Sequence, residues 1–224
     1  MLFKKIKYFL KLILPPFLTR ILILLINYRM IKHRDHPDTL FEDNDSLFKE
    51  EVKKVDLYGE YGCGKSTKWV LNNTSANVIA VDSSIEWVNY VLTSNSNNSS
   101  DRLNIHYANL GFVGNGGRPI NYEAIGNFSE YTDYIWNQKK TPKLVLIDGR
   151  FRVCCFLTSL KFAKEGTKIL FDDYIHRPYY HFVEKYVARS KEYGRQCMFV
   201  VPSKAEIDMA ELDKDIISFR NVME

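Results

Sequence analysis

Short apolar runs alternate with amphipathic stretches from residue 53 to the C-terminal part of the chain. Apolar runs bounded by turn-forming residues predict buried strands, and the stretches between them predict helices. The predicted strands cover residues 55–58, 77–82, 103–108, 143–148, 166–171 and 197–201. The predicted helices cover residues 66–72, 84–92, 153–161 and 179–193. This alternation predicts an α/β fold with a Rossmann-like, doubly wound, mostly parallel sheet.

Residues 1–34 follow another pattern, in which apolar residues recur at helical spacing and lysines border the apolar face. A basic amphipathic helix is typical of segments that bind an anionic membrane surface, and packing on the domain or on a second subunit is the alternative. Pro15, Pro16 and Arg20 interrupt the run, so a span of roughly 20 apolar residues is not expected. We therefore expect an N-terminal amphipathic helical extension over 1–34, a connector over 35–52 and one domain over 53–224.

Charge and cysteine usage narrow the class of protein. The net charge is +4, but residues 1–34 carry eight Lys and Arg and no acid, while the remainder carries 23 Lys and Arg against 27 Asp and Glu. The body is therefore acidic, which argues against nucleic-acid binding. The four cysteines show no C-x-x-C spacing, so neither a zinc site nor a disulfide framework is expected. These features favour a cytoplasmic protein that associates peripherally with the inner face of the membrane.

The octapeptide at residues 59–66 reads GEYGCGKS and fits two motifs. As G-x-x-x-x-G-K-S it is a P-loop, in which Lys65 would reach phosphate oxygens and Ser66 would bind Mg²⁺, as in a kinase or NTPase. As E-x-G-x-G-x-S it is the first loop of a Rossmann-like cofactor site. Residues elsewhere in the chain are needed to distinguish these two interpretations.

Polar residues at the ends of the predicted strands favour the cofactor loop. Asp82 lies 18 residues after Gly64, at the end of strand 77–82, where a Rossmann-like site needs an acid for ribose hydroxyls. Asn109 follows the third strand, and aspartates close the fourth and fifth strands. Ligands of open α/β sheets bind outside the carboxyl ends of the strands, so these side chains should meet at one site.

Three motifs carry a resemblance to a known family. They are EYGCGKST at 60–67, IDGRFR at 147–152 and DDYIHRPYYH at 172–181. With them the chain resembles the class I S-adenosylmethionine-dependent methyltransferases, and more narrowly a group of small bacterial methyltransferase-like proteins. The resemblance implies S-adenosylmethionine as cofactor. It also implies that the cofactor site is lined by Glu60, Gly62, Gly64, Asp82 and Asn109. Lys65 departs from the small residue more usual at its position.

The acids that close the fourth and fifth strands suggest chemistry beyond cofactor binding. Asp148, Asp172 and Asp173 are arranged in a way similar to the Mg²⁺ ligands of catechol-type O-methyltransferases, although Asp-Asp replaces the Asp-Asn pair of that family. Ion pairs with nearby arginines are the alternative. Asp148, Asp173 and His176 are the candidate catalytic residues, because each could accept a proton from the methyl acceptor; His181 is a further candidate base or a structural residue.

Arginines near the same strand ends predict an anionic acceptor. Arg150, Arg152 and Arg177 could bind a phosphate or a sugar acid, or could pair with the neighbouring aspartates. We therefore expect an S-adenosylmethionine-dependent methyltransferase that O-methylates a glycan or lipid-linked saccharide at the membrane surface. The alternatives are a P-loop kinase or NTPase, and a non-catalytic scaffold with a methyltransferase fold.

Overall fold

The computed structural model describes residues 15, 18, 21–22, 40–93 and 100–224. The predicted amphipathic helix over 1–34 and the start of the connector fall almost entirely outside the described residues, so both stay predictions. Within the described ranges, no helix is long and apolar enough to cross a membrane.

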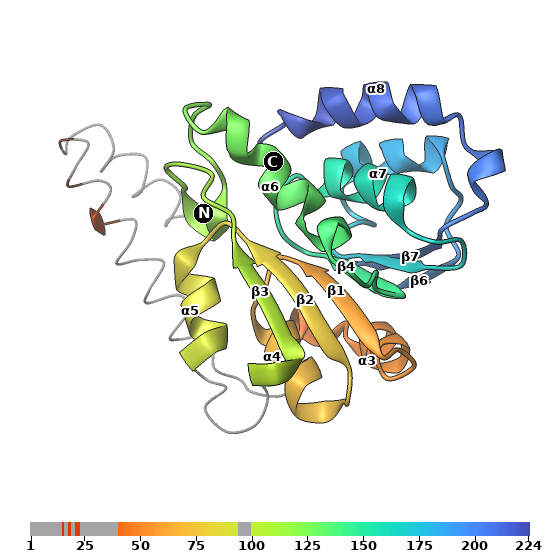
Figure 1. Cartoon of the computed structure of the whole chain (residues 1–224), viewed down its shortest axis with the longest axis horizontal. Helices are drawn as coiled ribbons and strands as arrows, with labels where there is room; N and C mark the ends of the chain where they lie inside the picture. The colour runs from red at the N-terminus through yellow and green to blue at the C-terminus, as the bar shows by residue number, and fades with distance from the viewer. Residues whose placement is uncertain (1–14, 16–17, 19–20, 23–39, 94–99) are drawn as a thin grey trace.

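One sheet forms the centre of the described structure (Figure 1). Its seven strands lie in the order β3-β2-β1-β4-β5-β7-β6. The strands are β1 Leu57–Tyr61, β2 Asn77–Asp82, β3 Leu103–Tyr107, β4 Leu144–Ile147, β5 Lys168–Phe171, β6 Lys191–Tyr193 and β7 Gln196–Val200. Strands β1 to β5 pair in parallel, and β7 pairs antiparallel with both β5 and β6. The predicted Rossmann-like, mostly parallel sheet is confirmed.

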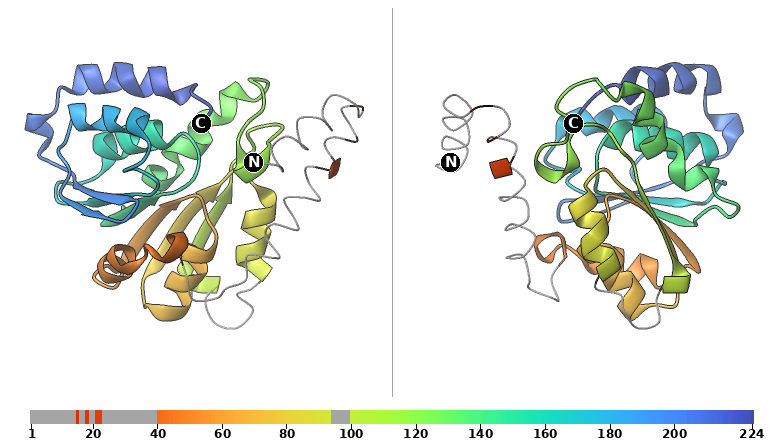
Figure 2. Two further views of the ribbon diagram at one scale, coloured as in Figure 1. Left: turned by 180° about the vertical axis from the view of Figure 1, so that it is seen from behind. Right: turned by 60° about the vertical axis from the view of Figure 1, so that its left-hand side comes forward.

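Helices cover both faces of the sheet (Figures 1 and 2). Helices α3 Ser46–Val52, α4 Lys65–Asn73 and α5 Ile85–Thr93 pack on one face, and α6 Phe128–Asp133, α7 Arg152–Phe162 and α8 Met209–Arg220 pack on the other. Alternate residues of a strand point to opposite faces. In β4, accordingly, Leu144 and Leu146 join the core under α3, α4 and α5, while Val145 and Ile147 join the core under α6, α7 and α8.

The predicted helix over 179–193 is wrong. A 3₁₀ helix, η6, covers Pro178–Lys185, and β6 then forms a hairpin with β7. Gly194 makes the turn with a φ of +56°, a conformation that favours glycine. All three side chains of β6 are exposed, so this edge strand carries no apolar run that would reveal it.

Candidate active site

The candidate site lies at the point where the strand order reverses, between β1 and β4. Strand β1 lies between β2 and β4, so the loops after β1 and β4 leave on opposite faces of the sheet, and ligands of open α/β sheets bind at this change of direction. Gly62 has a φ of +93°, and a Cβ there would lie 2.6 Å from the Gly149 Cα. The two loops therefore touch backbone to backbone, and only glycine fits at this point of contact.

Glu60 lies inside β1 and is fully buried, so it sits beneath the glycine loop. Its carboxylate accepts hydrogen bonds from the Ser66 hydroxyl and, at 2.5 Å, from the Thr67 hydroxyl. Thr67 Oγ1 also accepts a hydrogen bond from the Gly64 N–H at 2.9 Å. Glu60 thus fixes the first turn of α4 and the glycine loop. Burial raises the pKa of Glu60 to about 7 although both hydroxyls stabilise its charged form.

The same contacts bear on the P-loop interpretation. A P-loop uses the hydroxyl after its lysine to bind Mg²⁺. Here that hydroxyl, on Ser66, donates to Glu60 and is buried. The described arrangement therefore favours a loop fixed from below by an acid over a loop that binds a metal-bound nucleotide.

Asp82 ends β2 at the same edge of the sheet, and its side chain is buried. The Asp82 Oδ1 accepts a hydrogen bond from the Ser84 N–H at 2.7 Å. Burial raises the pKa of Asp82 to about 7, and the charge of Arg150 opposes that rise. Asn109 is exposed after β3, where its Oδ1 accepts a hydrogen bond from the Gly111 N–H within its own loop. The structure thus brings Asp82 to the glycine loop, while the Asn109 side chain bonds locally.

The glycine-rich loop after β3 lies against the end of β2, and sequence reasoning did not connect it with the site. The Ser83 hydroxyl donates to the Gly117 carbonyl at 2.7 Å, and a Cβ on Gly117 would lie 2.4 Å from that hydroxyl. A Cβ on Gly116 would lie 3.4 Å from the Arg150 guanidinium. The paired glycines were the available signal, because they permit this close approach.

Arginines neutralise the acids that close β4 and β5. Buried Arg152 donates to the Asp148 Oδ1 at 2.9 Å and to the Asp172 carbonyl at 2.7 Å. Arg177 pairs with Asp173 at 2.5 Å. These pairs match the ion-pairing alternative weighed for the acids. Burial and the neighbouring Asp172 raise the pKa of Asp148, although Arg152 opposes the rise.

Arg195 is the partner that sequence reasoning missed. It donates to both oxygens of fully buried Asp172, at 3.1 and 2.5 Å, and Gln196 adds a third hydrogen bond. Arg195 follows the β6–β7 turn, and its neighbours in sequence give no sign of this pairing. It also lies 3.3 Å from the Asp173 carboxylate.

The three aspartates do not fit a Mg²⁺ site. Asp172 is fully buried, and the positively charged Arg195 guanidinium donates to both of its oxygens, so a cation at this carboxylate would meet a like charge. Across residues 40–93 and 100–224, no group of three His, Cys, Asp or Glu side chains could hold a metal ion.

The two histidines take different places. His176 is exposed in the turn between β5 and η6. His181 lies with its Nε2 3.2 Å from the Tyr174 carbonyl and its Nδ1 3.4 Å from Arg189, and its ring packs on Tyr174. These contacts favour a structural role for His181.

The strand order and the glycine loop at its change of direction define a Rossmann-like fold of the methyltransferase type. Among solved structures, a methyltransferase-like protein from Silicibacter pomeroyi DSS-3 is 26% identical with a TM-score of 0.72, over 81% of this chain and 95% of that one. An O-methyltransferase from Bacillus cereus in complex with S-adenosylhomocysteine (SAH) is 15% identical with a TM-score of 0.51, over 87% and 96%. No protein-family model and no curated protein matches the chain.

Proposed function

We propose that this chain is an S-adenosylmethionine-dependent methyltransferase whose cofactor binds at the carboxyl edge of β1, β2 and β4. The observation that carries the proposal is the buried carboxylate of Asp82 beside the glycine loop. This loop requires glycine at position 62, because a side chain there would collide with the Gly149 backbone. The likeness to the Silicibacter protein, which is described as methyltransferase-like, supports it. The Bacillus cereus neighbour, crystallised with SAH, shares the fold.

The cofactor would supply a methyl group activated by a positively charged sulfur. The residues of this chain would bind and orient it: Gly62 allows the glycine loop to pack on Gly149, the Gly64 loop would contact the ligand through its backbone, and Asp82 would accept hydrogen bonds from ribose hydroxyls. Glu60 acts beneath the loop by holding Ser66 and Thr67.

An acceptor hydroxyl would need a group that takes its proton. We propose Asp148 for this role, because it follows β4 beside Gly149, its raised pKa suits a base near neutral pH, and a single arginine, Arg152, donates to its Oδ1. Asp173 is engaged by Arg177 and Arg195, and His176 lies exposed beyond β5.

We further propose that the acceptor is borne by a membrane, as a glycan or lipid-linked saccharide would be. The support is the run of eight basic residues without an acid over 1–34. Co-sedimentation of the full chain with vesicles tests it: anionic phosphatidylserine vesicles should retain the protein and neutral phosphatidylcholine vesicles should not. Replacing Lys4, Lys5, Lys7 and Lys11 with glutamine should release it. Equal binding to both vesicles would refute the electrostatic part of the proposal.

Titration calorimetry of SAH into two matched variants tests the cofactor site. Asp82→Asn should weaken SAH binding by at least about tenfold, since a hydrogen bond to a charged group contributes about 1.5–3 kcal/mol. Asp56→Asn is the control, because Asp56 is exposed at the opposite edge of the sheet, where it pairs with Lys143. Equal affinities of the two variants would refute the assignment of Asp82.

A further inference from the structure

A carboxylate of the chain itself lies at the start of α7, beside the proposed cofactor site. The Glu224 Oε1 accepts a hydrogen bond from the Val153 N–H at 3.0 Å. This N–H belongs to the first turn of α7, where backbone donors have no partner within the helix and the helix dipole favours an anion. The start of α7 therefore already holds one oxyanion.

Arg150 adds positive charge and an unused donor. Its Nη1 donates to the Glu224 backbone carbonyl at 3.1 Å. Its Nε is buried and has no hydrogen-bond partner among the described residues. A buried guanidinium N–H without an acceptor is costly, and an additional oxygen at this position would remove that cost. The Glu224 side chain thus accepts a hydrogen bond from the start of α7, while the Arg150 Nε–H still lacks an acceptor.

The segment that carries Glu224 is held by Met223, which packs against the core, and by hydrogen bonds to its backbone carbonyls. Arg118 donates to the Met223 carbonyl at 2.9 Å, and the Tyr122 hydroxyl donates to the Asn221 carbonyl at 3.1 Å. Asn221 and Val222 are exposed. Burial raises the pKa of Glu224, and the Val153 N–H, Arg152 and Arg150 oppose that rise.

Arg150 joins this position to the cofactor site. It is close enough to Asp82 for its charge to lower the pKa of that carboxyl, and a Cβ on Gly116 would lie 3.4 Å from its guanidinium. Of the three arginines expected to bind an anionic acceptor, Arg152 and Arg177 are engaged by aspartates. An anion bound at the start of α7 would therefore meet Arg150 and lie next to the proposed cofactor.

We propose that the first turn of α7 and Arg150 form a subsite for an oxyanion of the methyl acceptor, a phosphate or a carboxylate, and that Glu224 holds this subsite until the acceptor displaces it. That this oxyanion belongs to a methyl acceptor rests on the proposed function, whereas the binding of an oxyanion does not depend on it. Glu224 then acts as an internal competitor, which lowers the apparent affinity of the subsite for every anion by the same factor.

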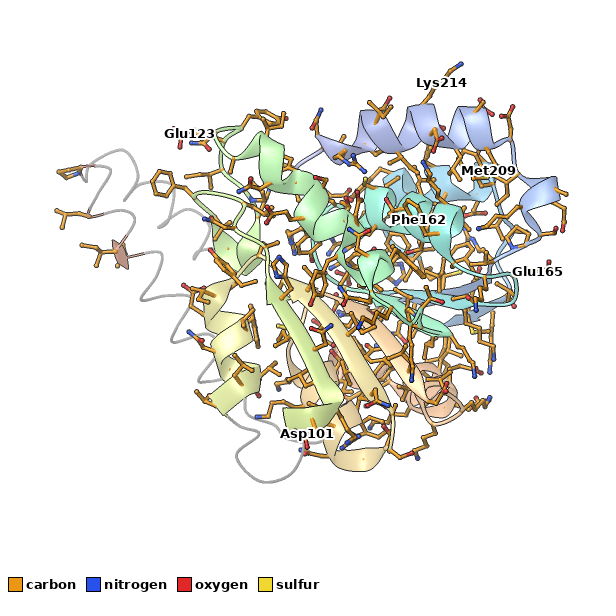
Figure 3. The ribbon with its side chains drawn as sticks, in the orientation of Figure 1. Asp101, Glu123, Phe162, Glu165, Met209 and Lys214 are labelled. Carbon is orange, nitrogen blue, oxygen red and sulfur yellow. The ribbon has the colours of Figure 1, made fainter. Side chains whose placement is uncertain are left out.

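Titration of the full chain with inorganic phosphate, followed by ³¹P NMR, tests the subsite. Glu224→Ala should bind phosphate at least about tenfold more tightly than the wild type, because removal of the competitor restores the competent state. The double variant with Arg150→Gln should lose this gain. Glu165→Gln is the matched control, since Glu165 lies exposed between α7 and β5, far from the C-terminal segment (Figure 3); it should bind phosphate as the wild type does.

A second measurement keeps the test valid if Glu224→Ala loosens the fold. The Val153 amide resonance of the wild type should shift when phosphate saturates the protein, and the shift should be larger in Glu224→Gln. Unchanged phosphate affinity in Glu224→Ala, or a gain that survives Arg150→Gln, would overturn the subsite. Binding of S-adenosylmethionine to the same variants separates the two proposals: normal cofactor binding without the phosphate gain refutes only the subsite, and the phosphate gain without cofactor binding refutes only the proposed function.

Discussion

Replacement of Gly62 with alanine tests the contact between the loops after β1 and β4. The alanine Cβ would lie 2.6 Å from the Gly149 Cα and 2.7 Å from the Gly149 nitrogen, both backbone atoms that cannot rotate away. Overpacking of this kind costs about 1–3 kcal/mol, and the φ of +93° adds about 1–2 kcal/mol. We expect Gly62→Ala to lower the free energy of unfolding by about 2–5 kcal/mol.

Two other glycines separate these contributions in urea unfolding. Gly166 has a φ of +80° with nothing within 4 Å of a Cβ, so Gly166→Ala should cost only about 1–2 kcal/mol. Gly126 has neither constraint, so Gly126→Ala should be neutral or stabilising by about 0.4–1 kcal/mol. If Gly62→Ala and Gly166→Ala destabilise equally, the loops do not touch and the reasoning fails.

Three further predictions concern charge. The folded-state pKa of Glu60 is raised from 4.5 to about 7, so its contribution to stability is complete below pH 4.5 and is lost as the pH rises through 7. In urea unfolding, the free energy of the wild type relative to Glu60→Gln should therefore fall by about 3 kcal/mol over this range. A difference that does not change with pH would refute the burial argument. Asp82 has a pKa of about 7, so its carboxyl should lose its proton between pH 6 and 8. Calorimetry should therefore show that the affinity for S-adenosylmethionine rises about tenfold over that range in the wild type and not in Asp82→Asn. Arg152→Ala should cost about 2–4 kcal/mol in unfolding free energy, because buried Arg152 donates to the Asp148 carboxylate and to the Asp172 carbonyl, and an acceptor left without its donor costs about 1–3 kcal/mol. Arg177→Ala should cost at most about 1 kcal/mol, because that side chain is 43% exposed; similar losses would contradict this difference in burial.

The buried strands of this fold could be predicted from sequence because their signal is local. Residues 77–82 form a strand with the predicted bounds, since polar residues flank an apolar run. β6 could not be found in this way, because its side chains are exposed and its pairing with β7 depends on a turn at Gly194.

The candidate site divides in the same manner. Asp82, Gly62 and Gly64 follow from spacing along the chain, and the structure gathers them at one edge. The pairing of Arg195 with Asp172 requires an antiparallel strand beside β5, and the contact of Gly117 with Ser83 requires a loop to fold back across 34 residues. Such contacts depend on tertiary packing, which no local pattern encodes.

The choice between the two motifs at residues 59–66 is the central claim, and titration calorimetry of the full chain tests it most directly. The chain should bind S-adenosylmethionine, and Lys65→Ala should retain that binding; Mg-ATP should give no signal. Binding of Mg-ATP that Lys65→Ala abolishes, with no binding of S-adenosylmethionine, would contradict the account. Binding of neither ligand would contradict it too and would favour a non-catalytic scaffold.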